Sequence, residues 1–244
     1  MRRTFAPSIA SLLLGLAFVA GCSSSDTPSS SDRVDSTVTT GTTSSENSSA
    51  AENDDDAEVT VGSVGFVDDD MLPQAYAVVD NPTKDIASIE VNFAAYDKGG
   101  DVVATETAYV IARSGSKMQV ATYISVPEDS KVDKVDAQVN VSDSQADDHP
   151  DSKMTANKVK VHVDEFTSTA TGTIDSSYEQ SVTNVEAVAI CTDKKGKTVG
   201  AGSTYLDGKV APGTPAPFEI PLSVDGKPTT CTVTAGLSSL SEGS

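Results

Sequence analysis

The chain has 244 residues and is strongly acidic, with 36 aspartate and glutamate residues against 17 lysine and arginine residues and a formal net charge of −19. This charge repels nucleic-acid phosphates and anionic lipid head groups, so it argues against either as a partner of the protein surface. It is typical of a soluble extracellular protein, and a salt-adapted source would show the same excess. The length allows one or two domains.

The first 21 residues have the pattern of a bacterial lipoprotein signal peptide. Arg2 and Arg3 supply positive charge, and residues 9–20 form an apolar core that is too short for a permanent membrane span. Small residues then lead to Cys22 in the sequence VAGC, which resembles a lipobox. We expect the Cys22 sulfur to be lipidated and Cys22 to become the new N-terminus; the alternative is an ordinary signal peptide with a chance cysteine.

A lipidated Cys22 predicts a protein held at the cell membrane on its extracytoplasmic face. Two or more acyl chains, palmitate among them, would bind the lipid bilayer stably. Seventeen of residues 23–57 are Ser or Thr, and only Val34 and Val38 are large and apolar. Such a segment cannot bury enough surface to offset its ordering entropy, so residues 22–57 are predicted to be a disordered tether.

From residue 58 onward the chain shows short runs of alternating apolar and polar residues, separated by Gly, Pro, Asp and Asn. Residues 86–97, 117–126 and 134–141 each follow a period of two, which is typical of half-buried strands. Many short strands at this spacing predict an all-β antiparallel sandwich architecture. The residues expected on the core face of these runs are Ile89, Val91, Phe93, Ala95, Met118, Val120, Ile124, Val126, Val135, Ala137, Val139 and Val141.

One phrase occurs twice, as FAAYDKGGDVV at 93–103 and AICTDKKGKTV at 189–199. A shift of 96 residues aligns the two phrases and preserves the alternation around them. The sequence therefore predicts two tandem homologous domains, at 58–143 and 156–240, joined by a polar linker at 144–155.

The Asp-Lys-x-Gly element within the phrase predicts a hairpin turn. Asp97 and Asp193 can accept hydrogen bonds from the turn backbone, while Gly100 and Gly196 can adopt the positive φ that returns the chain. A calcium site is the alternative, but it would need several more oxygen ligands and places a lysine among them.

The segment Phe93-Ala94-Ala95-Tyr96-Asp97 resembles the signature of the FxLYD domain, with Ala95 at the leucine position. The second copy keeps Asp193 and has Ala189 and Thr192 at the two aromatic positions. FxLYD domains are small immunoglobulin-like β-sandwiches of bacterial envelope proteins, often lipoproteins. The resemblance implies two tandem immunoglobulin-like domains that serve as binding or spacer modules, without known catalytic residues.

Two further cysteines, Cys191 and Cys231, lie in the second repeat, and alternation places both on core faces. In the repeat alignment they replace Ala95 and Val135. A disulfide across the core would therefore substitute for an apolar contact of the first copy, which is the interpretation that an exported domain favours. Two buried free thiols or a redox pair are the alternatives.

No catalytic constellation, cofactor motif or zinc-ligand spacing is recognisable in the sequence. His149 lies in the acidic linker, where a weak metal site is conceivable but a solvated loop is favoured. His162 is expected on the polar side of a strand. The acidic runs at 54–56 and 68–70 are interpreted as solvated turns. We expect no enzyme activity, no bound metal and no cofactor.

The leading hypothesis is a non-enzymatic surface lipoprotein whose tandem domains bind or position another envelope component. The alternative is an extracytoplasmic lipoprotein that binds a small ligand or a divalent cation. Pro217 and Pro221 are expected to protect one sheet edge of the second domain.

Overall fold

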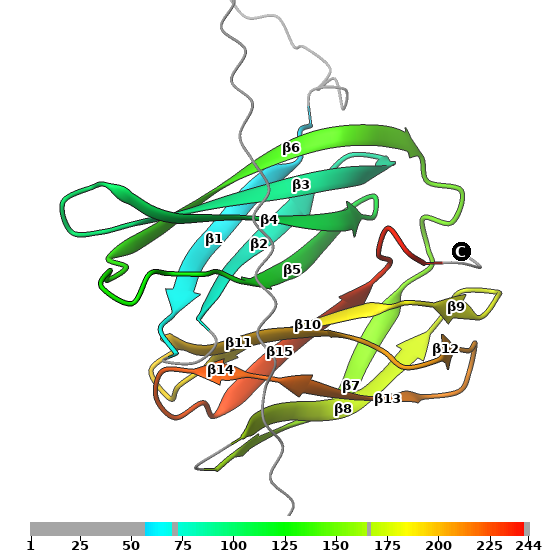
Figure 1. Ribbon diagram of the computed structural model, residues 1–244. Coiled ribbons are helices and arrows are strands. Elements are labelled where there is room, and N and C mark those ends of the chain that lie inside the picture. The colour runs from blue at the N-terminus through cyan, green and yellow to red at the C-terminus, as the bar shows by residue number, and fades with distance from the viewer. Residues whose placement is uncertain (1–56, 70–72, 165–166, 242–244) are drawn as a thin grey trace, which may run out of the picture. The chain divides into compact units, whose positions relative to one another are not determined.

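The computed structural model describes residues 57–69, 73–164 and 167–241. All regular secondary structure in these ranges is β-strand, and the paired strands run antiparallel, which confirms the predicted all-β fold class (Figure 1). The predicted signal peptide, the Cys22 lipidation site and the tether lie outside the described residues.

Two three-stranded sheets make up the first half of the fold. One sheet has the order β1-β2-β5 and the other the order β4-β3-β6. The six strands are β1 (Thr60–Val67), β2 (Gln74–Asn81), β3 (Asp85–Tyr96), β4 (Val102–Ala112), β5 (Ser116–Tyr123) and β6 (Lys134–Ala146).

The second half also packs two principal sheets, with the orders β13-β8-β7 and β14-β11-β10-β15, beside a small β12-β9 pair. Its strands are β7 (Met154–Val163), β8 (Ser168–Ser176), β9 (Val182–Thr183), β10 (Glu186–Thr192), β11 (Thr198–Tyr205), β12 (Lys209–Val210), β13 (Ala216–Pro221), β14 (Ser223–Val224) and β15 (Thr230–Gly236).

The strand orders of the two halves correspond. The β1-β2-β5 sheet matches β7-β8-β13, and β4-β3-β6 matches β11-β10-β15. The local irregularities match as well, because a register shift follows Ala95 in the β3–β4 pair and follows Cys191 in the β10–β11 pair. The predicted internal repeat is therefore a repeat of strand topology and register.

Each half has its own hydrophobic core, formed where the inward faces of its two sheets meet. Phe93 is the largest fully buried side chain and lies in the first core. The alternation in β3 is as predicted, with Glu90, Asn92 and Tyr96 on the opposite face. The prediction for Val141 is wrong: its side chain is 44% exposed, because it lies on β6, an edge strand that pairs only with β3.

Both predicted hairpin turns are confirmed. The backbone N–H of Gly100 donates to the Asp97 carbonyl oxygen and that of Gly196 to the Asp193 carbonyl oxygen, each at 3.0 Å. The Asp97 and Asp193 carboxylates accept further backbone N–H groups of the turns at 2.8–3.0 Å. Gly100 and Gly196 have φ values of 89° and 81°, which glycine adopts without steric cost.

The strands extend into the predicted linker, since β6 ends at Ala146 and β7 begins at Met154. Residues 147–153 connect the halves, and the two halves belong to one compact unit. Within this unit the outer face of the β1-β2-β5 sheet packs on the outer face of the β11-β10-β15 sheet. Val67, Ala121, Val188 and Ala201 form a small apolar cluster where these faces meet and are at most 5% exposed.

Candidate functional site

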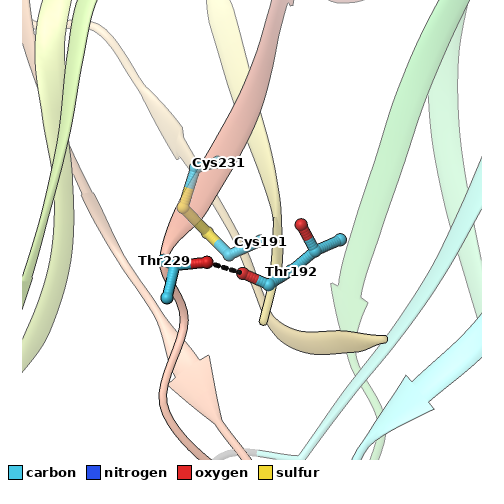
Figure 2. Close-up of a disulfide and its surroundings, with 4 residues drawn as sticks. All are labelled: Cys191, Thr192, Thr229 and Cys231. Carbon is cyan, nitrogen blue, oxygen red and sulfur yellow. Dashed lines mark hydrogen bonds between the residues drawn. A yellow bond between two sulfur atoms is a disulfide. The ribbon is translucent and has the colours of Figure 1, made fainter. Parts of the chain in front are cut away.

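The predicted disulfide between Cys191 and Cys231 is present, and both cysteines belong to the second core. The two residues are direct cross-strand partners on β10 and β15, with their Cα atoms 4.0 Å apart. Figure 2 shows the bridge between these neighbouring strands, and the hydroxyl of Thr229 donating to the Thr192 carbonyl oxygen. The disulfide therefore joins two strands of one sheet instead of crossing between sheets.

Arg113 forms the centre of a polar cluster where the two halves meet. Its guanidinium binds the Asp147 carboxylate through two nitrogens, with N–O distances of 2.8 and 2.6 Å. The same guanidinium donates to the hydroxyl of Tyr178 and to the carbonyl oxygen of His149. Arg113 thus connects the end of β4 to the connecting segment and to the second half.

This ion pair is largely removed from solvent, since the side chains of Arg113 and Asp147 are 14% and 3% exposed. Burial by itself raises the pKa of Asp147, but hydrogen bonds from the His149 N–H and the Arg113 guanidinium outweigh it and hold the pKa below its ordinary value. Burial raises the pKa of Tyr178, so its hydroxyl remains a donor as well as an acceptor.

Two further groups cross between the halves. The backbone N–H of Gln119 donates to the Thr234 hydroxyl at 3.0 Å. In the orientation that satisfies its amide, the buried Gln119 side chain donates to the carbonyl oxygens of Val188 and Thr232, both at 3.0 Å. The Asp69 carboxylate accepts the Val224 N–H at 3.2 Å, so this part of the acidic run at 68–70 is a structural contact and not the predicted solvated turn.

A cleft of about 540 Å³ opens beside the Arg113 cluster. Residues from the β4–β5 turn of the first half line it, together with the connecting segment, the start of β7 and the end of β15. We call it the junction cleft. Its lining residues include Ile111, Arg113, Lys117, Met118, Asp151, Lys153, Met154, Tyr178, Ala235 and Gly236.

The two histidines take part in local contacts. The His149 backbone N–H donates to Asp147 at 3.0 Å, so His149 helps to orient the Asp147 carboxylate through its main chain. His162 lies on the polar side of β7, as predicted, and its Nε2 is 3.1 Å from the Asp164 carboxylate at an exposed position.

Among the described residues, no three or more His, Cys, Asp or Glu side chains converge as a metal site would require. The described ranges also contain no helix long and apolar enough to cross a membrane. Pro217 and Pro221 lie on β13, an edge strand of its sheet, where we predicted edge protection.

Sequence reasoning missed the Arg113 cluster and the junction cleft. Arg113 is separated from Asp147 by 34 residues and from Tyr178 by 65, and no local period connects them. One signal was visible: Arg113 is the single arginine of residues 58–240 in a very acidic chain. Arginine is the preferred residue for buried, bidentate carboxylate pairs, so a lone arginine in an acidic segment indicates such a pair.

The chain matches no protein-family model, and no curated protein is significantly similar to it.

Proposed function

We propose that this is a non-enzymatic, lipid-anchored protein of the bacterial cell envelope whose two sandwiches act as one rigid arm that binds or positions an envelope component. The observation that supports it most directly is the junction of the two halves, where Arg113 joins the first half to the connecting segment and to Tyr178. A fixed junction gives both sandwiches one defined orientation toward a partner.

Rigidity is not the usual state of neighbouring domains, which move relative to each other unless their interface is extensive and apolar. Here the interface adds specific polar contacts to the small apolar cluster around Val188 and Ala201. Gln119 contributes both its backbone and its side chain to the second half. Such directional bonds fix an orientation more tightly than apolar contact alone, because each has a narrow geometric range.

The anchor is supported by the sequence around Cys22. Lipidation there would place the arm at the outer side of the cell membrane, at the end of a Ser/Thr-rich tether. The negative charge of the chain would keep the arm away from the anionic bilayer surface, where a partner protein could reach it.

Two experiments test this proposal. Cells fed a radiolabelled fatty acid should label the wild-type protein and leave a Cys22→Ser variant unlabelled and released from the membrane. A photo-crosslinking amino acid at exposed positions Tyr109 and Tyr123 should then recover one defined envelope partner from intact cells. Label on Cys22→Ser protein contradicts the anchor, and repeated recovery of no partner contradicts the binding role.

A further inference from the structure

Part of the lining of the junction cleft is apolar and adaptable, and we call this part the floor. Met118 and Met154, the two methionines of the described chain, both line it, together with Ile111. All three side chains are partly buried and pack against the edges of the two hydrophobic cores. Methionine side chains fill irregular space and adjust to different apolar partners, so a floor built from them suits an aliphatic ligand.

Three cationic side chains also line the cleft, in a chain whose net charge is −19, and we call this charged part of the lining the rim. They are Arg113, Lys117 and Lys153, and Asp151 is the one carboxylate among the described lining residues of the cleft. The Arg113 guanidinium is already bound to Asp147.

The two lysines of the rim differ in whether their ammonium groups already pair with a carboxylate. Lys117 is 2.8 Å from the Asp80 carboxylate, in an exposed pair that contributes little to stability. The Lys153 ammonium makes no hydrogen bond or ion pair with any described residue, and the residue is exposed. Lys153 is therefore the group on the rim that is free to receive an anion.

We propose that the junction cleft binds a small aliphatic monocarboxylate, with its chain on the floor formed by Met118, Met154 and Ile111 and its carboxylate beside Lys153. The Lys153 ammonium supplies one positive charge without an ion-pair partner among the described residues, which matches the single negative charge of a monocarboxylate. The cleft volume of about 540 Å³ is within the usual range for small-molecule sites, which commonly lie at domain junctions and combine an apolar lining with a few polar groups. The ligand would contact both halves and strengthen the junction.

This inference rests on the proposed binding role and names a ligand class for it. Its test uses the full chain with Cys22→Ser, which removes the lipid. A failed titration would therefore leave the labelling and crosslinking experiments unaffected.

The experiment is a titration with decanoate, below its micelle-forming concentration, of protein carrying ¹³C-labelled methionine methyl groups. We expect saturable shifts of the Met118 and Met154 methyl signals, assigned with Met118→Leu and Met154→Leu variants. Decanol tests the aliphatic body without the charge, and decyltrimethylammonium tests the opposite charge. Decanol should bind about tenfold more weakly than decanoate, and the cation more weakly still.

Variants separate the rim from the floor. Lys153→Gln should weaken decanoate binding about threefold, and Lys117→Gln with Lys153→Gln about tenfold, while both leave decanol binding unchanged. Lys160→Gln, a matched change on an exposed lysine of β7 outside the cleft, should have no effect.

Gly236→Leu tests the cavity itself. A Cβ at Gly236 would meet only the Met118 Cε, at 3.8 Å, so the backbone tolerates a side chain there and the larger residue should reduce binding of decanoate and decanol alike. The proposal is overturned if neither methionine signal responds, if decanol binds as tightly as decanoate, or if the double lysine variant binds decanoate like the wild type.

Discussion

The outer faces of two equivalent sheets differ sharply in this molecule. In the second half, the outer face of β10 and β11 presents Val188 and Ala201, which are 3% and 0% exposed and pack against the first half. In the first half, the same positions on β3 and β4 hold Asn92 and Thr105, and both are exposed. The same sheet therefore has an outer face that forms an interface in the second copy and a polar outer face that is exposed to solvent in the first.

This difference shows that the strand order and the chemical character of the outer surface depend on different residues of each strand. The inward residues keep the apolar character of both cores, because both sandwiches need the same packing. The outward residues are free of that requirement and have diverged to suit their surroundings. The outer face of the β1-β2-β5 sheet meets the apolar outer face of β10 and β11. The equivalent outer face of β3 and β4 in the first copy is polar, which discourages a further sandwich from packing there.

The largest expected effect concerns how each copy joins its central strands. Cys191→Ala with Cys231→Val installs the first half's pair, Ala95 and Val135, and should lower the free energy of unfolding by about 4 kcal/mol, because a loop spanning 40 residues is no longer closed in the unfolded chain. Urea denaturation with and without reductant measures this loss.

The reverse exchange sharpens the comparison. Ala95→Cys with Val135→Cys should form a second bridge, since these residues are also direct cross-strand partners. Its stabilisation should reach about 4 kcal/mol at most, since engineered bridges often introduce strain. An oxidised wild type that is no more stable than the reduced protein would contradict both expectations.

The next effect concerns the junction that links the copies. Arg113→Ala leaves the Asp147 carboxylate buried without its main partner and should cost about 3 kcal/mol of stability. It should also broaden the distance distribution between spin labels placed on the two halves, measured by pulsed electron paramagnetic resonance. Arg113→Lys keeps the charge but not the bidentate geometry and should give an intermediate result. An unchanged distribution in Arg113→Ala would show that the apolar cluster alone fixes the junction.

A third effect concerns the pH dependence of stability, because a glutamate of the second copy lacks the side-chain hydrogen-bond partner that its equivalent has in the first. Glu90 accepts a hydrogen bond from the Asn140 amide at 3.4 Å, whereas Gly236 stands at the corresponding position beside Glu186. Burial raises the pKa of Glu186 to about 7 from its ordinary value of 4.5.

The folded protein therefore retains the Glu186 proton at pH values where the unfolded chain has released it. The stabilisation from this proton is complete below about pH 4.5 and is lost as the pH rises through about 7, with a size on the order of 3 kcal/mol. Glu186→Gln should flatten the stability profile over this window, and Gly236→Asn should reduce its slope by supplying an amide. Thermal denaturation between pH 4 and 8 tests this, and a slope that persists in Glu186→Gln would refute the assignment.

The smallest effect should be equal in the two copies. Gly100→Ala and Gly196→Ala place a Cβ where φ is positive, and nothing else lies within 4 Å of that atom, so the cost is one of backbone conformation alone. Each change should destabilise the protein by about 1 kcal/mol. A clearly unequal pair of values, measured by chemical denaturation, would mean that the two hairpins are not equivalent.

The sequence by itself determined the strands, the hairpins and the repeat, because these depend on contacts that are local or in regular register. A period of two defines which residues face inward, and Asp-Lys-x-Gly specifies the same turn wherever it occurs. The repeat alignment also placed Cys191 and Cys231 on core faces at the positions of Ala95 and Val135, which favoured a disulfide between them. That these positions are direct cross-strand partners within one sheet is a result of the structure.

Only the tertiary structure decided which outer faces meet and what lies between them. Val188 and Asn92 both occupy outward positions of a central strand, and alternation assigns them the same environment. Arg113, Asp147 and Tyr178 come together from three separate segments, so their pairing depends on how the halves dock. The junction cleft arises from that same docking, since its lining comes from both halves, and no periodic pattern in the chain encodes it.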